Sequence, residues 1–376
     1  MLTSADVKQQ ARALGFDLCG IAPAAALPEL AYLEEWLARG YAGEMVYMHK
    51  SAATRADIRN FLPSARSVIV TGTFYHTEGS GGRDRGAGDG DQGAADRERG
   101  SGGRGPAPDR VRVARYARGD DYHVVLAGRL EALVAWMRER HREPFDAAVF
   151  VDKHHVQERV FARHAGIGWI GKNCCVINPE LGSWMLLAGV ATSLPLAPDA
   201  PASDQCGDCT LCLDACPTGA LVDAHVLDAR KCISYLTIEL QGPIPAGQRA
   251  DLGNHLFGCD ICQEVCPWNL GPPVTSDPAW QPRPRDGARA TELWQRTDQE
   301  LQGLVRGSAM LHTSLARLRR NLAIIIGNAG DSAAAAALDR PGHGIRNAAH
   351  SAQTPVVQEA VAWARARLAL PAAPDA

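Results

Sequence analysis

The chain contains 376 residues, of which 46% are hydrophobic and 22% are charged, and its formal net charge is −3. This length suits about two or three domains, and the composition is that of an ordinary soluble protein. No apolar run approaches the ~20 residues that cross a membrane, residues 1–10 show no signal peptide, and the small negative charge gives no global indication of nucleic-acid binding.

The first part of the chain is expected to form an α/β domain, because apolar strands alternate with helices. Thr3 or Ser4 caps a first helix that Gly15 ends. Residues 30–38 place apolar side chains on one helix face, and residues 67–74 and 184–190 have the unbroken apolar character of buried strands.

Residues 78–110 interrupt this pattern. The segment is crowded with glycine, aspartate and arginine and has almost no large apolar side chains. Because it cannot bury enough surface to offset the entropy of ordering, we expect a flexible surface insertion. An arginine- and glycine-rich RNA-binding tail is the alternative, but the mixed charges favour the insertion.

Asp152 directly follows a predicted strand at 147–151 and precedes a predicted helix at 155–164. Ligand sites of α/β proteins open at strand ends, so Asp152 is a candidate functional carboxyl. Capping the following helix is the alternative role for this side chain. His154 and His155 are alternative proton carriers, although exposed positions without a role are the simpler interpretation.

Residues 166–173 read GIGWIGKN and match the pattern G-x-G-x-x-G. The nucleotide-binding form of this motif follows a strand, whereas the predicted helix at 155–164 precedes the glycines here. We therefore expect a turn at which backbone approaches a bulky cofactor.

Eight cysteines form two interlocked motifs. The first reads C-x2-C-x2-C-x3-C-P and the second C-x2-C-x3-C-P, with a lone cysteine between them. The first spacing is that of bacterial ferredoxins, in which the fourth cysteine ligates the other cluster. This crossover predicts two [4Fe–4S] clusters, one held by Cys206, Cys209, Cys212 and Cys266, and one by Cys216, Cys232, Cys259 and Cys262.

Zinc ribbons are the alternative, because paired C-x2-C units also bind zinc. The two C-P endings and the C-x2-C-x2-C triplet favour iron–sulfur clusters. Eleven cysteines in a chain without an export signal indicate metal in a reducing cytoplasm rather than disulfides. Cys19, Cys174 and Cys175 are then expected to be small buried side chains.

The tail beyond a proline-rich linker at 272–284 is expected to be helical. Residues 318–327 and 356–365 show the same apolar helical face at an offset of 38 (356 minus 318), with a helix at 332–338 between them. This period predicts HEAT-like repeats, and two packed helical hairpins are the alternative.

Together these stretches resemble the epoxyqueuosine reductases, corrinoid iron–sulfur enzymes of tRNA queuosine synthesis. The resemblance is carried by RY at 115–116 with DYH at 121–123, AGIGWIGKN at 165–173, NPELGSW at 178–184, RKCISYLTIE at 230–239, GCDICQEVCPWN at 258–269, and RRNLA at 319–323 with GN at 327–328. One departure is that KHHVQE at 153–158 replaces the Ser-Ala-Pro-Val-Leu-Glu-like run that usually follows the family's catalytic aspartate.

The resemblance implies an α/β cobalamin-binding catalytic domain at 1–195, a ferredoxin-like dicluster domain at 196–280 and a helical HEAT-like domain at 285–376. It implies reduction of epoxyqueuosine at the tRNA wobble position to queuosine, the last step of queuosine synthesis, with Asp152 as the proton donor. The implied contacts to cob(II)alamin are Arg55, Lys172, Asn173, Val176, Ser234 and Asp260. Contacts to tRNA phosphate would come from Arg317, Arg319 and Arg320, for which a solvated helix face is the alternative.

Converting an epoxide to an alkene needs electrons that no ordinary side chain supplies, so redox cofactors must provide them. A carboxyl group in a partly desolvated pocket can hold a proton near neutral pH for the leaving oxygen. We expect a cytoplasmic monomer that has no membrane contact and receives electrons from a ferredoxin- or flavodoxin-like donor. The alternatives are a reductive dehalogenase-like corrinoid enzyme and a dicluster electron carrier.

Overall fold

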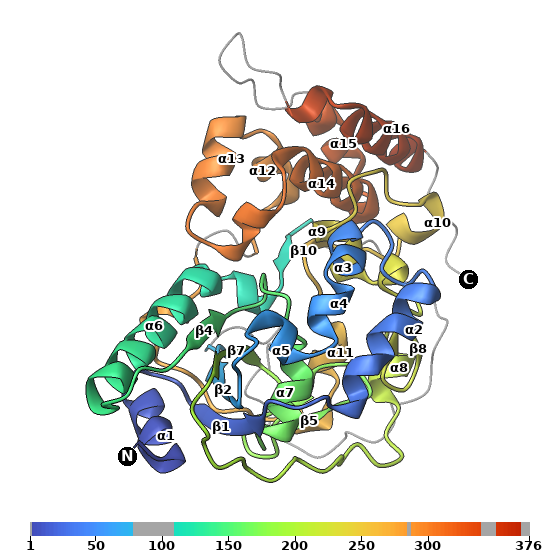
Figure 1. The fold of residues 1–376 in the computed structure, drawn as a ribbon. Helices are drawn as coiled ribbons and strands as arrows, with labels where there is room; N and C mark the ends of the chain where they lie inside the picture. The colour runs from blue at the N-terminus through green and yellow to red at the C-terminus, as the bar shows by residue number, and fades with distance from the viewer. Residues whose placement is uncertain (1, 78–108, 284–286, 340–350, 370–376) are drawn as a thin grey trace, which may run out of the picture.

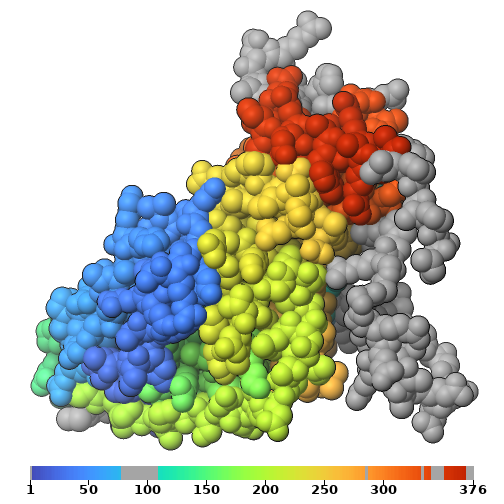
Figure 2. Space-filling view, turned by 90° about the vertical axis from the view of Figure 1, so that its right-hand side faces the viewer, coloured from blue at the N-terminus to red at the C-terminus, as the bar shows by residue number. Residues whose placement is uncertain are grey.

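The computed structural model describes residues 2–77, 109–283, 287–339 and 351–369 (Figure 1). The insertion expected at 78–110 lies almost entirely outside these residues. Figure 2 shows the segment of the cysteine motifs, in yellow, between the N-terminal part in blue and the C-terminal helices in red. Among the helices of the four ranges, none combines the length and the apolar character that crossing a bilayer requires.

A four-stranded sheet forms the centre of the N-terminal part. Its strands lie in the order β1, β2, β7 and β4. All residues of β2 are buried, which confirms the buried strand predicted at 67–74. The bounds are β1 Leu18–Pro23, β2 Ser67–Phe74, β4 Ala147–Phe150 and β7 Met185–Thr192.

The strands of this sheet run antiparallel, and no strand direction was predicted from the sequence. All three pairings are antiparallel, and Val70, for example, lies opposite Gly20 on one side and Gly189 on the other. The alternation of helices with strands predicted an α/β domain, whose ligand sites open at the ends of parallel strands. Alternation does not determine direction, because a helical connection can also return the chain antiparallel. Asp152 follows β4, as expected, but the rule for parallel sheets gives no support for a ligand site there.

Helices cover both faces of the sheet, because successive residues of a strand point to opposite faces. Ile69 belongs to the core that includes α1 and α6, whereas Val68 and Val70 belong to the core that includes α7. Helix α1 begins with a capping box at Thr3 and ends before Gly15, as predicted. The three helices are α1 Ser4–Ala13, α6 Tyr122–Arg140 and α7 Glu158–His164.

Shorter elements complete the description of this part. A hairpin of β5 and β6 has the end of the glycine-rich stretch, residues 171–173, between its strands, whereas Gly166 and Gly168 precede β5. The short elements are η1 Pro28–Ala31, α2 Tyr32–Ala38, α3 Val46–Lys50, α4 Ala52–Arg55, α5 Ile58–Phe61, β3 Arg112–Val113, η2 Arg115–Ala117, β5 Trp169–Ile170 and β6 Val176–Ile177.

The cysteine segment is joined to the N-terminal part through backbone hydrogen bonds. Strand β10 pairs in parallel with β3, and the amide of Ala114 donates to the carbonyl of Phe257 at 2.8 Å. The carboxylate of Asp260 accepts from the amide of Arg115 at 2.9 Å. The elements are α8 Leu211–Asp214, β8 Leu221–Asp223, β9 Val226–Leu227, η3 Ala229–Lys231, α9 Ile233–Ile238, α10 Ala246–Arg249, β10 His255–Phe257, α11 Ile261–Glu264 and η4 Pro267–Asn269.

The tail is helical, as predicted. Helices α14 and α16 approach closely, since a Cβ on Gly327 would meet the Cα of Ala364 at 2.9 Å. Trp280 is buried, so the proline-rich stretch packs on the body rather than forming a free linker. The elements are η5 Pro278–Trp280, α12 Ala290–Trp294, α13 Asp298–Val305, η6 Ala309–His312, α14 Leu315–Ala329, α15 Ser332–Leu338, η7 Ser351–Gln353 and α16 Pro355–Ala369. The HEAT-like repeat itself stays a prediction.

Two of the arginines expected to contact tRNA are buried, with exposures of 0% for Arg319 and 1% for Arg320. Arg319 donates to the carbonyl oxygens of Trp294 and Arg296 at 2.9 and 2.7 Å, and Arg320 donates to that of Leu240 at 2.7 Å. The phosphate-binding expectation is wrong for both, because their guanidinium groups are used inside the protein. The third of these arginines is half-buried.

Candidate active site

The first predicted ligand set lies around one cavity. Cys206, Cys209 and Cys212 precede or lie in α8, and Cys266 follows α11. The indole of Trp169 donates to the sulfur of Cys206 at 3.4 Å. The cavity is lined by Lys172, Asn173, Ile177, Cys206, Cys209, Cys212, Cys266, Pro267 and Trp268.

The second predicted set also comes together. Burial raises the pKa of Cys259, and the neighbouring Cys232 and Cys216 add to this rise. Cys262 lies close to both Cys259 and Cys232. The amide of Ala220 donates to the sulfur of Cys216 at 3.3 Å. Segments far apart in the sequence therefore contribute four sulfurs to one place.

This arrangement contains the crossover predicted from the spacing. Cys266 of the second motif lies with the first three cysteines, and Cys216 of the first motif lies with the second set. Four thiolates around one place fit a [4Fe–4S] cluster, and the two sets fit two of them. The assignment of individual cysteines as ligands stays a prediction.

Sequence reasoning missed one sulfur near the second set. Cys175 was expected to be an ordinary core side chain, but its thiol hydrogen-bonds with Cys262. Cys19 is buried, as expected, and Cys174 is half-buried with a φ of 64°. No spacing rule links Cys175 to either motif, so only the fold reveals this contact.

Asp152 lies in the loop between β4 and α7 with a φ of 45°, a conformation that is uncommon for a residue other than glycine. Glu158 supports this backbone, because its Oε1 accepts from the amide of Asp152 at 2.6 Å. The Asp152 side chain is 59% exposed. Helix α7 begins at Glu158 without a side-chain cap, so the helix-capping alternative for Asp152 is wrong.

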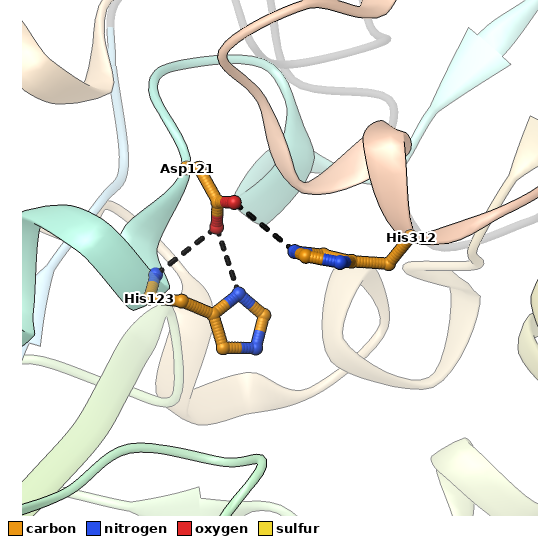
Figure 3. A group of neighbouring side chains, drawn as sticks. All are labelled: Asp121, His123 and His312. Carbon is orange, nitrogen blue, oxygen red and sulfur yellow. Dashed lines mark hydrogen bonds and ion pairs between the residues drawn. The ribbon is translucent and has the colours of Figure 1, made fainter.

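The carboxylate of Asp152 is one end of a hydrogen-bonded network. Its Oδ2 accepts from the Tyr122 hydroxyl at 2.6 Å and lies 3.2 Å from Nε2 of His123. The other ring nitrogen of His123 lies 2.7 Å from Oδ1 of Asp121, and Nε2 of His312 lies 3.0 Å from Oδ2 of Asp121 (Figure 3). The tripeptide 121–123 was noted in the sequence without a role, and His312 was not noted.

The neighbouring carboxyl groups of Asp152 and Glu158 have pKa values that shift in opposite directions. Burial raises the pKa of Asp152, but hydrogen bonds from His123 and Tyr122 outweigh burial and hold the pKa below its usual range. Burial, together with the charge of Asp152, raises the pKa of Glu158 to about 8. We expected desolvation to let Asp152 keep a proton near neutral pH, and this expectation is wrong because the hydrogen bonds favour its charged form.

The two histidines after Asp152 are exposed. His154 is held locally, since its Nδ1 accepts from the amide of Val151 at 3.0 Å, and its ring packs edge-on against Phe61. The hydrogen bonds that reach the Asp152 side chain come from Tyr122 and His123 instead.

Three of the predicted corrinoid contacts are buried, namely Asn173, Val176 and Asp260. The Asn173 amide donates to the carbonyl of Cys262 at 3.4 Å. Burial raises the pKa of Asp260 to about 6, against the hydrogen bond from the Arg115 amide. Asn173 therefore contacts the backbone of the second cysteine set, and Asp260 directly follows its Cys259.

The other three are half-buried, namely Arg55, Lys172 and Ser234. Arg55 donates to the carbonyl of Val156 at 3.1 Å, in the loop that carries Asp152. Lys172 donates to the carbonyl of Gly207 at 2.6 Å, beside the first cysteine set. Arg55 therefore lies at the Asp152 loop and Lys172 at the first cysteine set.

Side chains from separate segments surround the Asp152 carboxylate. Burial raises the pKa of Tyr116, and the charges of Asp152, Asp260 and Glu239 add to this rise. The pKa of Tyr47, which is 46% exposed, is raised by desolvation and by the charges of Glu239 and Asp152.

Asp260 directly follows Cys259 and accepts from the Arg115 amide, and the Tyr122 hydroxyl of the same segment donates to Asp152. The segment 115–122 therefore contacts both the Asp152 carboxylate and the second cysteine set. Tyr47 and Asp152 are partly exposed, so polar groups beside this segment are open to a large polar cofactor such as a corrinoid.

Two family models match the chain. A 4Fe-4S double cluster binding domain matches residues 205–269, and the model described as epoxyqueuosine reductase QueG, DUF1730, matches residues 55–153. The chain therefore carries a domain of the double 4Fe–4S cluster type over the cysteine motifs.

Whole-chain relatives agree with these models. The epoxyqueuosine reductase of Gloeobacter violaceus is 40% identical over 89% of this chain and 99% of its own length. A solved epoxyqueuosine reductase with an epoxyqueuosine-modified tRNA-Tyr stem loop matches with a TM-score of 0.79 and 29% identity, over 97% of this chain and 89% of that one. A Bacillus subtilis epoxyqueuosine reductase whose catalytic aspartate loop is swung out of the active site matches with a TM-score of 0.81 and 28% identity, over 98% and 91%.

Proposed function

The chain belongs to the epoxyqueuosine reductase family, and from this premise we propose that it reduces the epoxide of epoxyqueuosine in tRNA to the alkene of queuosine. One observation of the structure carries the proposal. The segment 115–122 contacts both functional groups, because the Arg115 amide donates to Asp260, next to the second cysteine set, and the Tyr122 hydroxyl donates to Asp152.

The reaction removes one oxygen atom from the substrate. Both C–O bonds of the epoxide break, a C=C bond forms, and two electrons and two protons convert the oxygen to water. Side chains do not supply such electrons, so the double 4Fe–4S cluster domain carries them. We assign the cluster ligands to the two cysteine sets described above.

We propose cob(II)alamin as the further cofactor, bound by the N-terminal part beside the second cysteine set. When bound, a corrinoid supplies a strongly reducing cobalt centre for the epoxide carbon. The half-buried donors Arg55, Lys172 and Ser234 would hold its polar periphery, and Asn173, Val176 and Asp260 would shape the wall behind it. The partly open setting of Tyr47 and Asp152 supports room for such a group.

We propose that Asp152 delivers protons to the epoxide oxygen. Its exposed carboxylate is oriented by Tyr122 and His123, and its backbone is held by Glu158. Burial raises the pKa of Tyr122 far above its usual range, so this hydroxyl orients Asp152 and keeps its own proton. Asp152 is thereby an exposed carboxylate that is oriented by Tyr122 and lies within hydrogen-bonding distance of His123.

The substrate base would enter from a single-stranded anticodon loop, whose bases splay out more easily than paired ones. Phosphate contacts make such binding weaker as salt rises, and the net charge of −3 requires the basic contacts to be local. We further propose a cytoplasmic monomer that is reduced by a ferredoxin- or flavodoxin-like protein.

The test is anaerobic reconstitution with iron, sulfide, cobalamin and a reductant, followed by nucleoside mass spectrometry of epoxyqueuosine-containing tRNA. We expect conversion to queuosine and about eight irons per chain, four for each cluster. Turnover by protein free of cobalt would overturn the corrinoid assignment. Intact substrate after incubation with fully loaded, reduced protein would overturn the function.

A further inference from the structure

Asp152 is connected to a half-buried histidine, His123, to which the proposed function gives only an orienting role. The His123 side chain is 11% exposed and lies between two carboxylates, Asp152 on its Nε2 side and Asp121 on its Nδ1 side. His312 closes the network from η6, on the far side of Asp121 (Figure 3). The contact joins residues that are 191 positions apart.

The hydrogen positions in this network follow from the acceptors. Burial raises the pKa of Asp121, but hydrogen bonds from His123 outweigh burial and leave the pKa below its usual range. A carboxylate only accepts hydrogen bonds, so Nδ1 of His123 and Nε2 of His312 both carry hydrogen. The nitrogen of His123 that exchanges a proton is therefore Nε2, which faces Oδ2 of Asp152.

A metal ion is the alternative occupant, since the ligand atoms of Asp121, His123 and His312 lie within 4.8 Å of one another. Hydrogen bonds already account for this geometry. Oδ1 of Asp121 accepts from Nδ1 and the amide of His123, at 2.7 and 3.1 Å, and Oδ2 accepts from His312 at 3.0 Å. Both carboxylate oxygens are thus used, and we assign the cluster to proton handling.

We propose that His123 is the proton store from which Asp152 draws both protons of the reaction. The inference rests on the proposed function and deepens it. Nε2 of His123 passes a proton to Oδ2 of Asp152, which passes it to the epoxide oxygen as the first C–O bond breaks. His123 regains a proton from solvent, and the same transfer protonates the resulting hydroxyl as the second C–O bond breaks and water leaves. The two electrons arrive through the iron–sulfur clusters, so atoms and charge balance.

In this assignment Asp121 and His312 are positioning residues. Asp121 fixes the Nδ1–H form of His123 and holds the ring against Asp152. Burial lowers the pKa of His312, so at neutral pH this residue is an uncharged donor that immobilises Asp121. The groups that face the network are Asp121 and Tyr122 of α6 and its cap, Asp152 and Lys153 of the loop, Glu158 and Arg159 of α7, and His312 of η6.

The test uses the reconstituted holoenzyme with the variants His123→Gln and His123→Ala. Glutamine keeps a hydrogen-bonding group but carries no exchangeable charge, and we expect the turnover rate to fall about 100-fold. Iron content, cobalt content and tRNA affinity are expected to stay at wild-type values. Added imidazole should restore turnover of His123→Ala in proportion to its protonated fraction, which a purely structural role would not produce.

His164→Gln is the matched control. His164 is also a half-buried histidine paired with a carboxylate, Glu29 at 3.1 Å, but it lies outside the network. We expect wild-type turnover for this variant. The single variant His312→Gln should turn over a few-fold more slowly than wild type. Adding His312→Gln to His123→Gln should not lower the turnover rate further, because the effects of residues that act together are not additive.

The outcomes separate the inference from the function on which it rests. If His123→Gln keeps the wild-type rate and pH profile while Asp152→Asn loses turnover, the proton store is refuted and the reductase function stands. If His123→Ala loses turnover and imidazole in its protonated form restores nothing, His123 is structural and the inference is again refuted. If wild-type protein fails to convert the substrate, the proposed function fails first.

Discussion

Glu158→Gln tests the electrostatics of the Asp152 loop. Burial and the charge of Asp152 raise the pKa of Glu158 from 4.5 to about 8. When folding raises the pKa of a carboxyl group, the folded protein is most stable at pH values below the pKa of the unfolded state. This stability is lost as the pH rises through the pKa of the folded state. The window is therefore pH 4.5 to 8. At 1.36 kcal/mol per pH unit, the unfolding free energy can change by at most about 5 kcal/mol across this window. Because solvent and structural relaxation reduce such energies, we expect a change of about 2 kcal/mol.

The assay is urea unfolding of the holoprotein under anaerobic conditions at several pH values from 5 to 9. Wild type should lose stability across this interval, and Glu158→Gln should lose about 2 kcal/mol less because a neutral amide has no proton to release. Glutamine retains an oxygen that accepts from the Asp152 amide. Glu131→Gln, at an exposed position of α6, is the control and should follow wild type. Identical pH dependence in wild type and Glu158→Gln would refute the reasoning.

Three further predictions concern the clusters, the acid and the tail. Cys266→Ser should remove one cluster and leave the second, which iron analysis would detect as about four irons per chain; loss of both clusters, or of neither, would contradict the crossed ligand sets. Asp152→Asn should keep both clusters and bind tRNA normally but lose at least about 100-fold in turnover, and unchanged turnover in loaded protein would move the acid elsewhere. Arg319→Met should lower the unfolding free energy by about 3 kcal/mol, because it removes the ion pair with Asp298 and leaves two carbonyl oxygens without this donor; urea unfolding with no change would show that these bonds contribute little.

The cysteine sets could be predicted because their information is local. The spacing of each motif fixes which sulfurs a single turn can present to one cluster, and the crossover rule supplies the fourth. The first helix and the strand at 67–74 were predictable for a similar reason, since cap residues and unbroken apolar runs act over a few residues. The structure has both elements close to the expected bounds.

The rest depends on contacts between distant segments. A buried strand has the same apolar pattern whether its neighbour runs parallel or antiparallel to it. The pattern therefore could not predict the direction of the strands in the sheet. His312 meets Asp121 across 191 positions, and nothing near either residue encodes that meeting. Arg319 lies on a helix whose apolar face was recognised, but its burial depends on carbonyl oxygens supplied by an earlier helix, which no periodicity reveals.

The pairing of β3 with β10 has a consequence for how the protein is assembled in the cell. Arg115 and Asp260 are 145 positions apart, so their interface closes late, after most of the chain has been synthesised. Because metal ligation and folding are thermodynamically coupled, iron–sulfur cluster insertion and closure of this interface should reinforce each other. Iron starvation would then lower the stability of the whole chain. Without clusters, residues 109–118 should separate from the cysteine segment, and proteases should cleave there first.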